Sequence, residues 1–176
     1  YSNFTLFLND PINGDAIRQK ESRKIYGYNS LYGKEFSIRG KPASWESGAG
    51  IRYDDVSGSE LSHVKARHTF LDAITLGNID QMTGSVFTEV SWNAAPGLNV
   101  TGGLRFDAFS FQYSNSLNSL YERATETASR LSPKLNIHYD FSPDLQLYIK
   151  NGMGFHSNDA RVVTSRQSEK TLPKAF

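Results

Sequence analysis

The chain has 176 residues, which suffices for one domain with its own core, and its charge is nearly balanced, with 19 Lys and Arg against 18 Asp and Glu. It has no cysteine, which excludes disulfides, thiolate metal sites and a cysteine nucleophile, and no basic run that would suit a nucleic acid. No window approaches 18 apolar residues, so a transmembrane helix is excluded, whereas half-apolar transmembrane strands stay open.

The first third of the chain predicts short strands separated by turns. Residues 2–8 alternate as a strand, and the turn formers at 9–15 reverse the chain. Residues 16–28 carry charge on both parities, so a helix is an alternative there, but we expect a strand that ends in a tight reversal at Asn29-Ser30. Another strand is expected near 31–39, before a short turn at 40–45.

The middle of the chain alternates between clear strands and polar stretches. Strands are predicted at 46–54, 81–93 and 98–113, with a turn at Asn93–Gly97. The polar stretches 55–80 and 114–130 lack sustained alternation and predict two long loops, the first with a weak helical patch.

Residues 130–161 give the clearest pattern in the chain. Leu135, Ile137, Tyr139 and Phe141 share one parity, and the alternation restarts with Leu145, Leu147 and Ile149 after a turn at 142–144. Side chains of a strand point alternately to opposite faces, so this is a hairpin with one apolar and one polar face. Each strand is about long enough to cross a bilayer at a tilt.

The lengths of the connections favour an up-and-down antiparallel sheet. Short turns near 9–15, 40–45, 94–97 and 142–144 are expected on one edge, and long loops at 55–80, 114–130 and 156–171 on the other. That asymmetry is typical of an outer-membrane barrel, with short periplasmic turns and long extracellular loops. In the cleanest strands every charge lies on the polar parity; these are Arg52, Glu89, Arg105, Asp107, Lys134, Asp140 and Lys150.

Several features have plainer explanations than a chemical site. His63, His68 and Asp72 could ligate a metal, but solvated loop histidines explain them better because no further ligands are visible. His138 and Asp140 share a strand face without a nucleophile elbow, so hydrolysis is not expected. Aromatic residues near predicted strand ends could form a girdle or be ordinary strand residues; they are Tyr26, Tyr28, Trp45, Tyr53, Trp92 and Tyr113.

Three motifs resemble the barrel of TonB-dependent outer-membrane receptors. The most specific is Ser132-Pro133-Lys134-Leu135, then Leu147-Tyr148, then Gly154-Phe155-His156-Ser157-Asn158-Asp159-Ala160-Arg161. A second is Gly84-Ser85-Val86-Phe87-Thr88-Glu89 followed by Thr101-Gly102-Gly103-Leu104-Arg105-Phe106-Asp107. The third joins Ser2-Asn3-Phe4-Thr5, Asp10-Pro11 and Gly14-Asp15 to Gln19, Arg23 and Tyr26-Gly27.

The resemblance implies an all-β segment of roughly eight strands from a barrel of about 22. Residues 1–176 would be one partial barrel region of a larger receptor, with no plug domain. Such receptors import scarce ligands, usually ferric siderophores, across the outer membrane of Gram-negative bacteria and draw energy through TonB. The implied partners are the plug and remaining strands of the same receptor, TonB through the absent part, outer-membrane lipid and a small-molecule or metal-chelate ligand.

We therefore expect ligand binding and channel formation without catalysis, cofactor or metal site. Lumen-facing cations could contact an anionic ligand or the plug, and the polar motif after the last strand could contact a ligand or form ion pairs. The candidate ligand-binding residues are Arg52, Arg105, Lys150, His156, Asn158, Asp159 and Arg161. The alternative is a soluble antiparallel β-sandwich or barrel that acts as a binding module.

Overall fold

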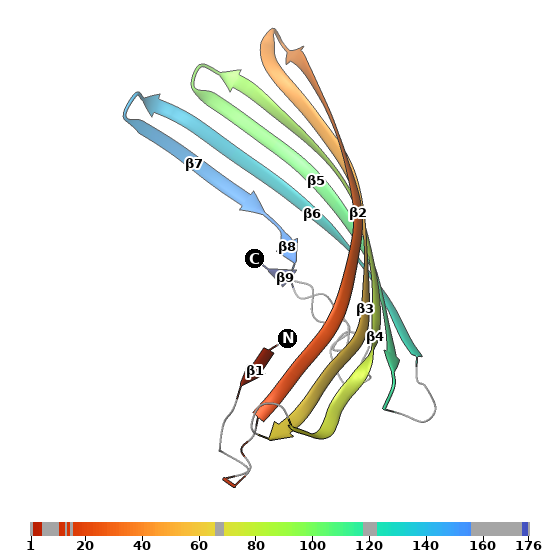
Figure 1. The fold of residues 1–176 in the computed structure, drawn as a ribbon. Helices are drawn as coiled ribbons and strands as arrows, with labels where there is room; N and C mark the ends of the chain where they lie inside the picture. Colours follow the sequence, from red (N-terminus) through yellow and green to blue (C-terminus); the bar gives the residue numbers. More distant parts are fainter. Residues whose placement is uncertain are drawn as a thin grey trace.

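The chain forms an antiparallel sheet of seven strands in sequence order, as a computed structural model shows (Figure 1). The structure describes residues 2–4, 11, 12, 14, 16–65, 69–117, 123–155, 174 and 175. The strands of the main sheet are β1 (Ser2–Phe4), β2 (Ala16–Ile38), β3 (Lys41–Lys65), β4 (Thr69–Ala95), β5 (Leu98–Asn115), β6 (Arg123–Ser142) and β7 (Leu145–Gly152). A separate two-stranded sheet pairs β8 (Gly154–Phe155) with β9 (Lys174–Ala175). None of the described residues forms a helix that could cross a membrane.

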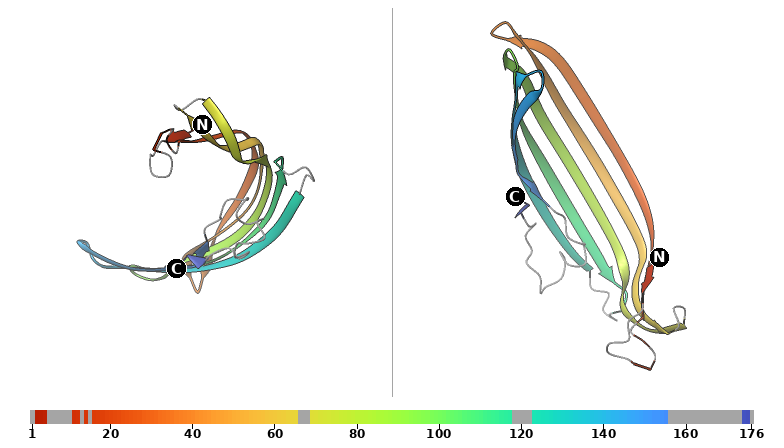
Figure 2. Two further views of the ribbon diagram at one scale, coloured as in Figure 1. Left: turned by 90° about the horizontal axis from the view of Figure 1, so that it is seen from below. Right: turned by 90° about the vertical axis from the view of Figure 1, so that its left-hand side faces the viewer.

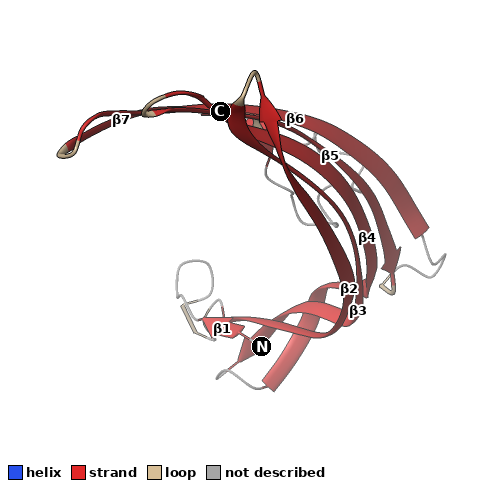
Figure 3. Cartoon of the chain, turned by 90° about the horizontal axis from the view of Figure 1, so that it is seen from above, coloured by secondary structure: helices blue, strands red, loops and turns tan. Residues whose placement is uncertain are grey.

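The sheet is curved into an open arc, so the predicted class of an up-and-down barrel segment is confirmed (Figures 2 and 3). Every strand of the main sheet pairs with its neighbour in sequence, and the strands β2, β3 and β4 are the longest at 23, 25 and 27 residues. Because consecutive strands pair directly, the two edges of the arc are β7 and the long part of β2 beyond the short β1.

Three tight turns join the strands at one edge of the arc, shown at the top of Figure 1. They lie between Ile38 and Lys41, between Ala95 and Leu98, and between Ser142 and Leu145. The first is a two-residue turn in which Arg39 and Gly40 both have positive φ, at 52° and 74°. Such turns match the twist of the flanking strands, which explains why the chain reverses at this point.

Replacing Gly40 with valine is expected to lower the free energy of unfolding by about 1–2 kcal/mol, because a side chain at this φ meets the following carbonyl. The measurement is equilibrium unfolding of the receptor barrel in lipid vesicles. Gly33→Val is the matched control, because Gly33 lies within regular pairing of the same two strands and has no positive φ. Equal losses for both variants would contradict the proposed role of the turn.

The register divides the side chains of β3–β6 into two faces of different chemistry. One face carries a belt of uncharged residues, which we call the apolar belt, from the level of Trp92 to the level of Met82 on β4. These eleven residues at about 3.3 Å each, tilted by about 45°, span about 25 Å, the height of the apolar band of a transmembrane barrel. Lys34 on the edge strand β2, opposite Trp45, is the exception, and its long stem can carry the ammonium to the membrane surface.

The apolar belt covers the convex face of the arc. On a curved sheet the side chains of the concave face converge, and those of the convex face diverge. A Cβ added at Gly48 or Gly103, on the charged face, would lie 2.4 Å or 3.1 Å from a neighbouring side chain. At Gly84 and Gly102, within the belt, it would meet nothing within 4 Å. The charged face is therefore concave, and it is the face that would line a barrel lumen.

Aromatic pairs mark both borders of the apolar belt. At the loop side the rings of Tyr26 and Tyr53 stack at 6.4 Å, and the Tyr53 hydroxyl donates to Asp80 at 2.6 Å. At the turn side Tyr32 and Trp45 form an edge-to-face pair at 5.6 Å. These positions suit an aromatic girdle. Tyr113 does not belong to it, because it packs against a cluster on the concave face.

Two sequence predictions about reversals are wrong. The chain does not turn at Asn29-Ser30, because β2 runs without interruption from Ala16 to Ile38 and pairs regularly with β3 there. The predicted strand at 16–28 is confirmed, as one half of this longer strand. Because one reversal too many was predicted, the turn near 9–15 was assigned to the wrong edge of the sheet. Phe4 pairs with Ile17, so the connection from β1 to β2 lies at the loop edge and not with the short turns.

The predicted long loops at 55–80 and 114–130 are mostly strand. Strand β3 continues to Lys65 and β4 starts at Thr69, so a hairpin extends well beyond the end of the apolar belt. Strand β5 continues to Asn115 and β6 starts at Arg123. Of the predicted loop at 156–171, all residues lie outside the described part of the chain.

Candidate functional site

Two Arg-x-Asp units on the concave face form the same kind of ion pair, in which the aspartate accepts hydrogen bonds from the arginine two residues before it. Arg52 donates from Nε and Nη2 to Asp54 at 2.9 and 3.0 Å, and Arg105 donates from the same atoms to Asp107 at 2.8–3.0 Å. The carboxylates are buried, with side-chain exposures of 6% and 1%, while the arginine side chains are about half exposed, at 54% and 50%. Each aspartate therefore orients an arginine whose outer nitrogen still faces the concave side.

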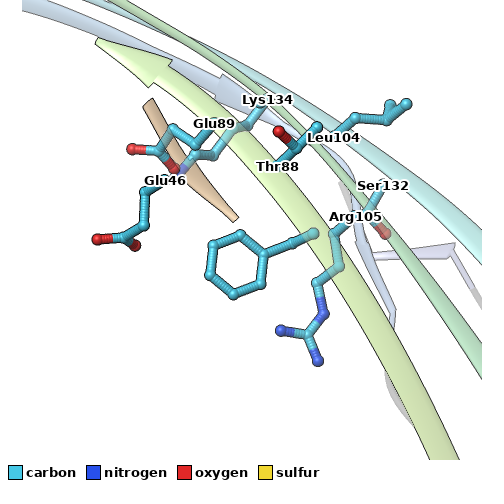
Figure 4. Close-up of a pocket in the computed structure, with 9 residues that line it drawn as sticks. Glu46, Thr88, Glu89, Leu104, Arg105, Ser132 and Lys134 are labelled. Carbon is cyan, nitrogen blue, oxygen red and sulfur yellow. Dashed lines mark ion pairs between the residues drawn. The ribbon is translucent and has the colours of Figure 1, made fainter. Parts of the chain in front are cut away.

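Arg105 borders a shallow cavity of about 270 Å³ on the concave face (Figure 4). The cavity is lined by side chains from β3 to β6, which the register brings into two adjacent rows: Glu46, Phe87, Glu89, Arg105, Ser132 and Lys134. Lys134 forms an ion pair with Glu89, and Glu46 lies directly opposite Glu89 on the neighbouring strand. The cavity thus places the Arg105 guanidinium near two carboxylates, of which Glu89 is paired with Lys134.

The structure places the predicted cations on one face but does not bring them together. By the register, Arg52 and Arg105 lie two strands apart, which is about 10 Å across the sheet. Along the strands they are separated by two side-chain rows, which is about 13 Å. Lys150 lies on the outer strand β7, with its ammonium 5.1 Å from the centre of the Tyr148 ring. The remaining predicted residues His156, Asn158, Asp159 and Arg161 lie outside the described residues.

Sequence reasoning missed five of these six lining residues as members of the site: Glu46, Phe87, Glu89, Ser132 and Lys134. The signal was available, since Glu89, Lys134 and Arg105 were all assigned to the polar parity. What the sequence lacked was the register that sets Glu46 opposite Glu89 and Gly103 opposite Lys134.

The concave face changes character towards the turn edge. Hydroxyl and amide groups of Ser91, Asn93, Asn99 and Thr101 bond one another at 2.8–3.2 Å, and these four residues are uncharged. Such groups can exchange hydrogen bonds with water or with a passing polar ligand. These four residues therefore form an uncharged polar patch at this end of the concave face.

Towards the loop edge the concave face carries an apolar cluster. Val56, Ile79, Phe109 and Phe111 are buried, with the two phenyl rings stacked at 6.0 Å, and Tyr113 packs against them. The cluster lies where the hairpin of β3 and β4 leaves the rest of the sheet, next to a bulge between Val56 and Ser59. It therefore stabilises the base of this hairpin extension.

An ion pair ties the hairpin extension to β2, beyond the apolar belt. Arg18 donates to Glu60 at 2.5 Å, and the Ser62 hydroxyl donates to the same carboxylate at 2.7 Å. These hydrogen bonds, the one from Arg18 first, lower the pKa of Glu60 below its ordinary value. A carboxylate with a lowered pKa stabilises the folded state above its unfolded pKa, and this contribution is lost as the pH falls through the folded pKa.

Acidification below the ordinary pKa of a glutamate is accordingly expected to loosen the hairpin extension. The measurement is hydrogen exchange of residues 59–64 across a pH series, corrected for the intrinsic exchange rate. Glu60→Gln is expected to show lower protection at neutral pH and a flatter pH dependence. The same pH dependence in both proteins would contradict a role for Glu60.

No cluster of three or more metal-ligating His, Asp or Glu side chains is found within the described ranges. His63 contacts Asp72 through Nδ1 at 3.0 Å, and both side chains are exposed. His68 lies outside the described part of the chain. His138 and Asp140 form an ion pair at 3.3 Å on the concave face.

Comparison with known proteins gives one match. Residues 1–167 match a family model described as TonB dependent receptor-like, beta-barrel. Neither a curated protein nor a solved structure matches the chain.

Proposed function

The chain belongs to the TonB-dependent receptor β-barrel family, and from this premise we propose that it forms part of the wall of an outer-membrane import channel. Members of this family are outer-membrane receptors of Gram-negative bacteria that act in transport rather than catalysis. The proposed role of this chain is to face lipid with the apolar belt and to face the ligand path with the concave side.

The separation of charge between the two faces carries this proposal. The belt residues of β3–β6 include no charged side chain, although their large apolar groups are exposed, as for Val86 and Leu131 at 53% each. Both arginines of the Arg-x-Asp units lie on the opposite face. A lipid-facing charge is costly, whereas a hydrated lumen accepts it, so the distribution fits a membrane barrel.

The exposed apolar belt also weighs against the alternative of a soluble sandwich or barrel. A soluble module would have to bury these side chains in a core, and a sandwich would pack a second sheet against them. Here they remain on the convex surface, with Phe106 43% and Leu131 53% exposed. The outer-membrane interpretation is therefore the better supported of the two.

The ligand that we propose is anionic, such as a ferric siderophore. Arg105 uses two of its three nitrogens for Asp107, and among the described residues no partner is recorded for Nη1, which leaves directed donors for an acceptor in the lumen. Because the aspartate neutralises the pair, the arginine acts through oriented hydrogen bonds rather than long-range attraction. Lys150 adds an ammonium without a carboxylate partner among the described residues.

The proposed receptor includes more than this chain. Its remaining strands would pair with β7 and with the open part of β2, whose backbone groups need partners inside a bilayer. A plug domain would fill the lumen and contact the concave charges, and TonB would supply energy through a part beyond these residues. This assembly is the context in which the site is to be tested.

Replacing Lys150 with glutamine in the receptor is expected to weaken binding of an anionic iron chelate about tenfold, since a charge-assisted contact contributes about 1.5 kcal/mol. The measurement is uptake and binding of radiolabelled ferric siderophores by cells that express the receptor at equal surface levels. Gln146→Lys, which adds a cation four residues away on the same face, tests whether position matters. Unchanged import by Lys150→Gln would remove Lys150 from the site, and no import of any iron chelate by the wild type would contradict the proposed substrate class.

A further inference from the structure

A shallow trough crosses the apolar belt on the convex face. Its floor is a row of small residues that the register aligns across three strands, Gly84 on β4, Ala108 on β5 and Ser129 on β6. One wall is the adjacent row Val86, Phe106 and Leu131, and the other is formed by Tyr28, Ile51 and Met82. We call this feature the belt trough.

Two adjoining cavities of about 360 and 480 Å³ make up the belt trough, and they share Gly84 and Ala108. No charged side chain lines either of them. The first reaches Tyr28 on β2 and the second reaches Thr127 and Ser129 on β6, so the trough extends over five strands. It is open to the convex side along its length, whereas a pocket for a compact ligand would be enclosed.

Gly84 lies in the floor and lines both cavities. A Cβ added there would meet nothing within 4 Å, and its pairing with Ile51 and Ala108 is regular, without a bulge. Its φ is not in the positive range that requires glycine. Glycine weakens a regular strand, since it leaves no side chain to pack. Such a glycine often marks a place where a ligand or another backbone approaches closely.

The length of the belt trough fits one lipid chain. Four strand spacings of about 4.8 Å give a trough of roughly 19 Å, and a strand tilt of about 45° lets it span about 14 Å along the membrane normal. One leaflet of a hydrocarbon core about 30 Å thick is about 15 Å deep. The trough lies wholly inside the apolar belt, so the molecules that surround it in a bilayer are acyl chains.

We propose that the belt trough is a binding site for one acyl chain of a membrane lipid, held between the Val86–Phe106–Leu131 wall and the Tyr28–Ile51–Met82 wall. The site rests on the outer-membrane location proposed above, and it goes beyond general contact with lipid because it is one ordered chain at one place. Filling the floor displaces the chain, while the same change elsewhere in the belt does not.

The test uses the complete receptor in nanodiscs of phosphatidylethanolamine and phosphatidylglycerol with a trace of phosphatidylethanolamine that carries a photoreactive acyl chain. Adducts are mapped by peptide mass spectrometry. Gly84→Leu and Ala108→Leu are each expected to lower adducts on Val86 and Phe106 at least fivefold. Gly102→Leu is the matched control, because Gly102 faces lipid with equal open space but lies outside the trough, and it is expected to leave these adducts unchanged.

Heat-modifiable mobility in gels confirms that each variant is folded, and the two floor variants keep the test decisive if one of them fails to fold. Equal labelling of the whole belt that neither floor variant alters would overturn the site while leaving the outer-membrane location intact. Crosslinks from the trough to a second copy of the protein would also overturn it. Absence of lipid adducts from every belt residue would overturn both the site and the location.

Discussion

Replacing Val86 with arginine is expected to destabilise the membrane-inserted receptor by about 2–4 kcal/mol, the cost of a cation on the lipid face near the bilayer midplane. Val86 lies in the middle of the apolar belt, between the levels of Met82 and Trp92, and is 53% exposed on the convex side. The measurement is equilibrium unfolding of the receptor barrel from lipid vesicles, with the amount assembled in the outer membrane as a second readout.

The neighbouring substitution Phe87→Arg is the matched control. Phe87 lies in the same strand but faces the concave side, where it lines the cavity with Glu46 and Glu89. An arginine there would meet two carboxylates and water, so a loss below half that of Val86→Arg is expected. A larger loss for Phe87→Arg than for Val86→Arg would mean that the two faces have been assigned the wrong way round.

Replacing Asp107 with alanine is expected to cost about 2–3 kcal/mol, because it leaves Arg105 without its partner. The carboxylate is 1% exposed and accepts three hydrogen bonds from Arg105, and Arg130 lies opposite it on β6 with a buried Nε that has no recorded partner in the described part of the chain. The cost is smaller than for a fully buried pair because the Arg105 side chain is half exposed and water can reach it.

A double-mutant cycle separates the pair from its surroundings. Arg105→Met combined with Asp107→Leu removes both charges, and it is expected to recover at least half of the stability lost in Asp107→Ala. Additive losses in the double variant would show that Asp107 acts through Arg130 or the backbone rather than through Arg105.

Alternation of side chains allowed much of the membrane-spanning part to be predicted. Ile137 and Tyr139 pair with Ile149 and Leu147, as the two apolar faces of the terminal hairpin required. The charges of Arg52, Arg105 and Lys150 lie on the concave face, as their parity implied. Lipid on one side and water on the other impose a strict period of two, so sequence records the faces wherever the strand crosses the belt.

Beyond the belt this information disappears. The residues at 57–65 and 69–77 continue as paired strands although their pattern predicted a loop. The buried positions of this extension include the polar residues Ser59 and Ser62 beside Val64, so burial here does not produce the alternation of apolar and polar residues that marks the belt. The false reversal at Asn29-Ser30 has a related cause, because a polar pair within a strand resembles a turn when the neighbouring strand is not known.

The cavity was not predicted as a site, and among the described residues that the sequence had named as ligand-binding, Arg105 alone lines it. Parity was sufficient to place Arg105 and Lys134 on the same face, but the pairing of Arg52 with Asp54 and of Arg105 with Asp107 was found only in the structure. The cavity depends on Glu46 facing Glu89 and Lys134 reaching Glu89 across the gap at Gly103, which follows from the register of three separate strand pairs. Register across strands is a property of the whole sheet, and local sequence does not specify it.

A spin-label scan along β4 tests the central claim most directly. Because these 176 residues contain no cysteine, single cysteines at positions 82 to 90 can each carry one label in a receptor whose other parts are also free of cysteine. The account predicts that labels at even positions, on the convex face, are relaxed mainly by dissolved oxygen, while odd positions are shielded from it and respond to a water-soluble nickel chelate wherever the lumen is open. Equal oxygen exposure at both parities, or greater exposure at the odd positions, would contradict a barrel wall with a lipid-facing belt and a charged lumen.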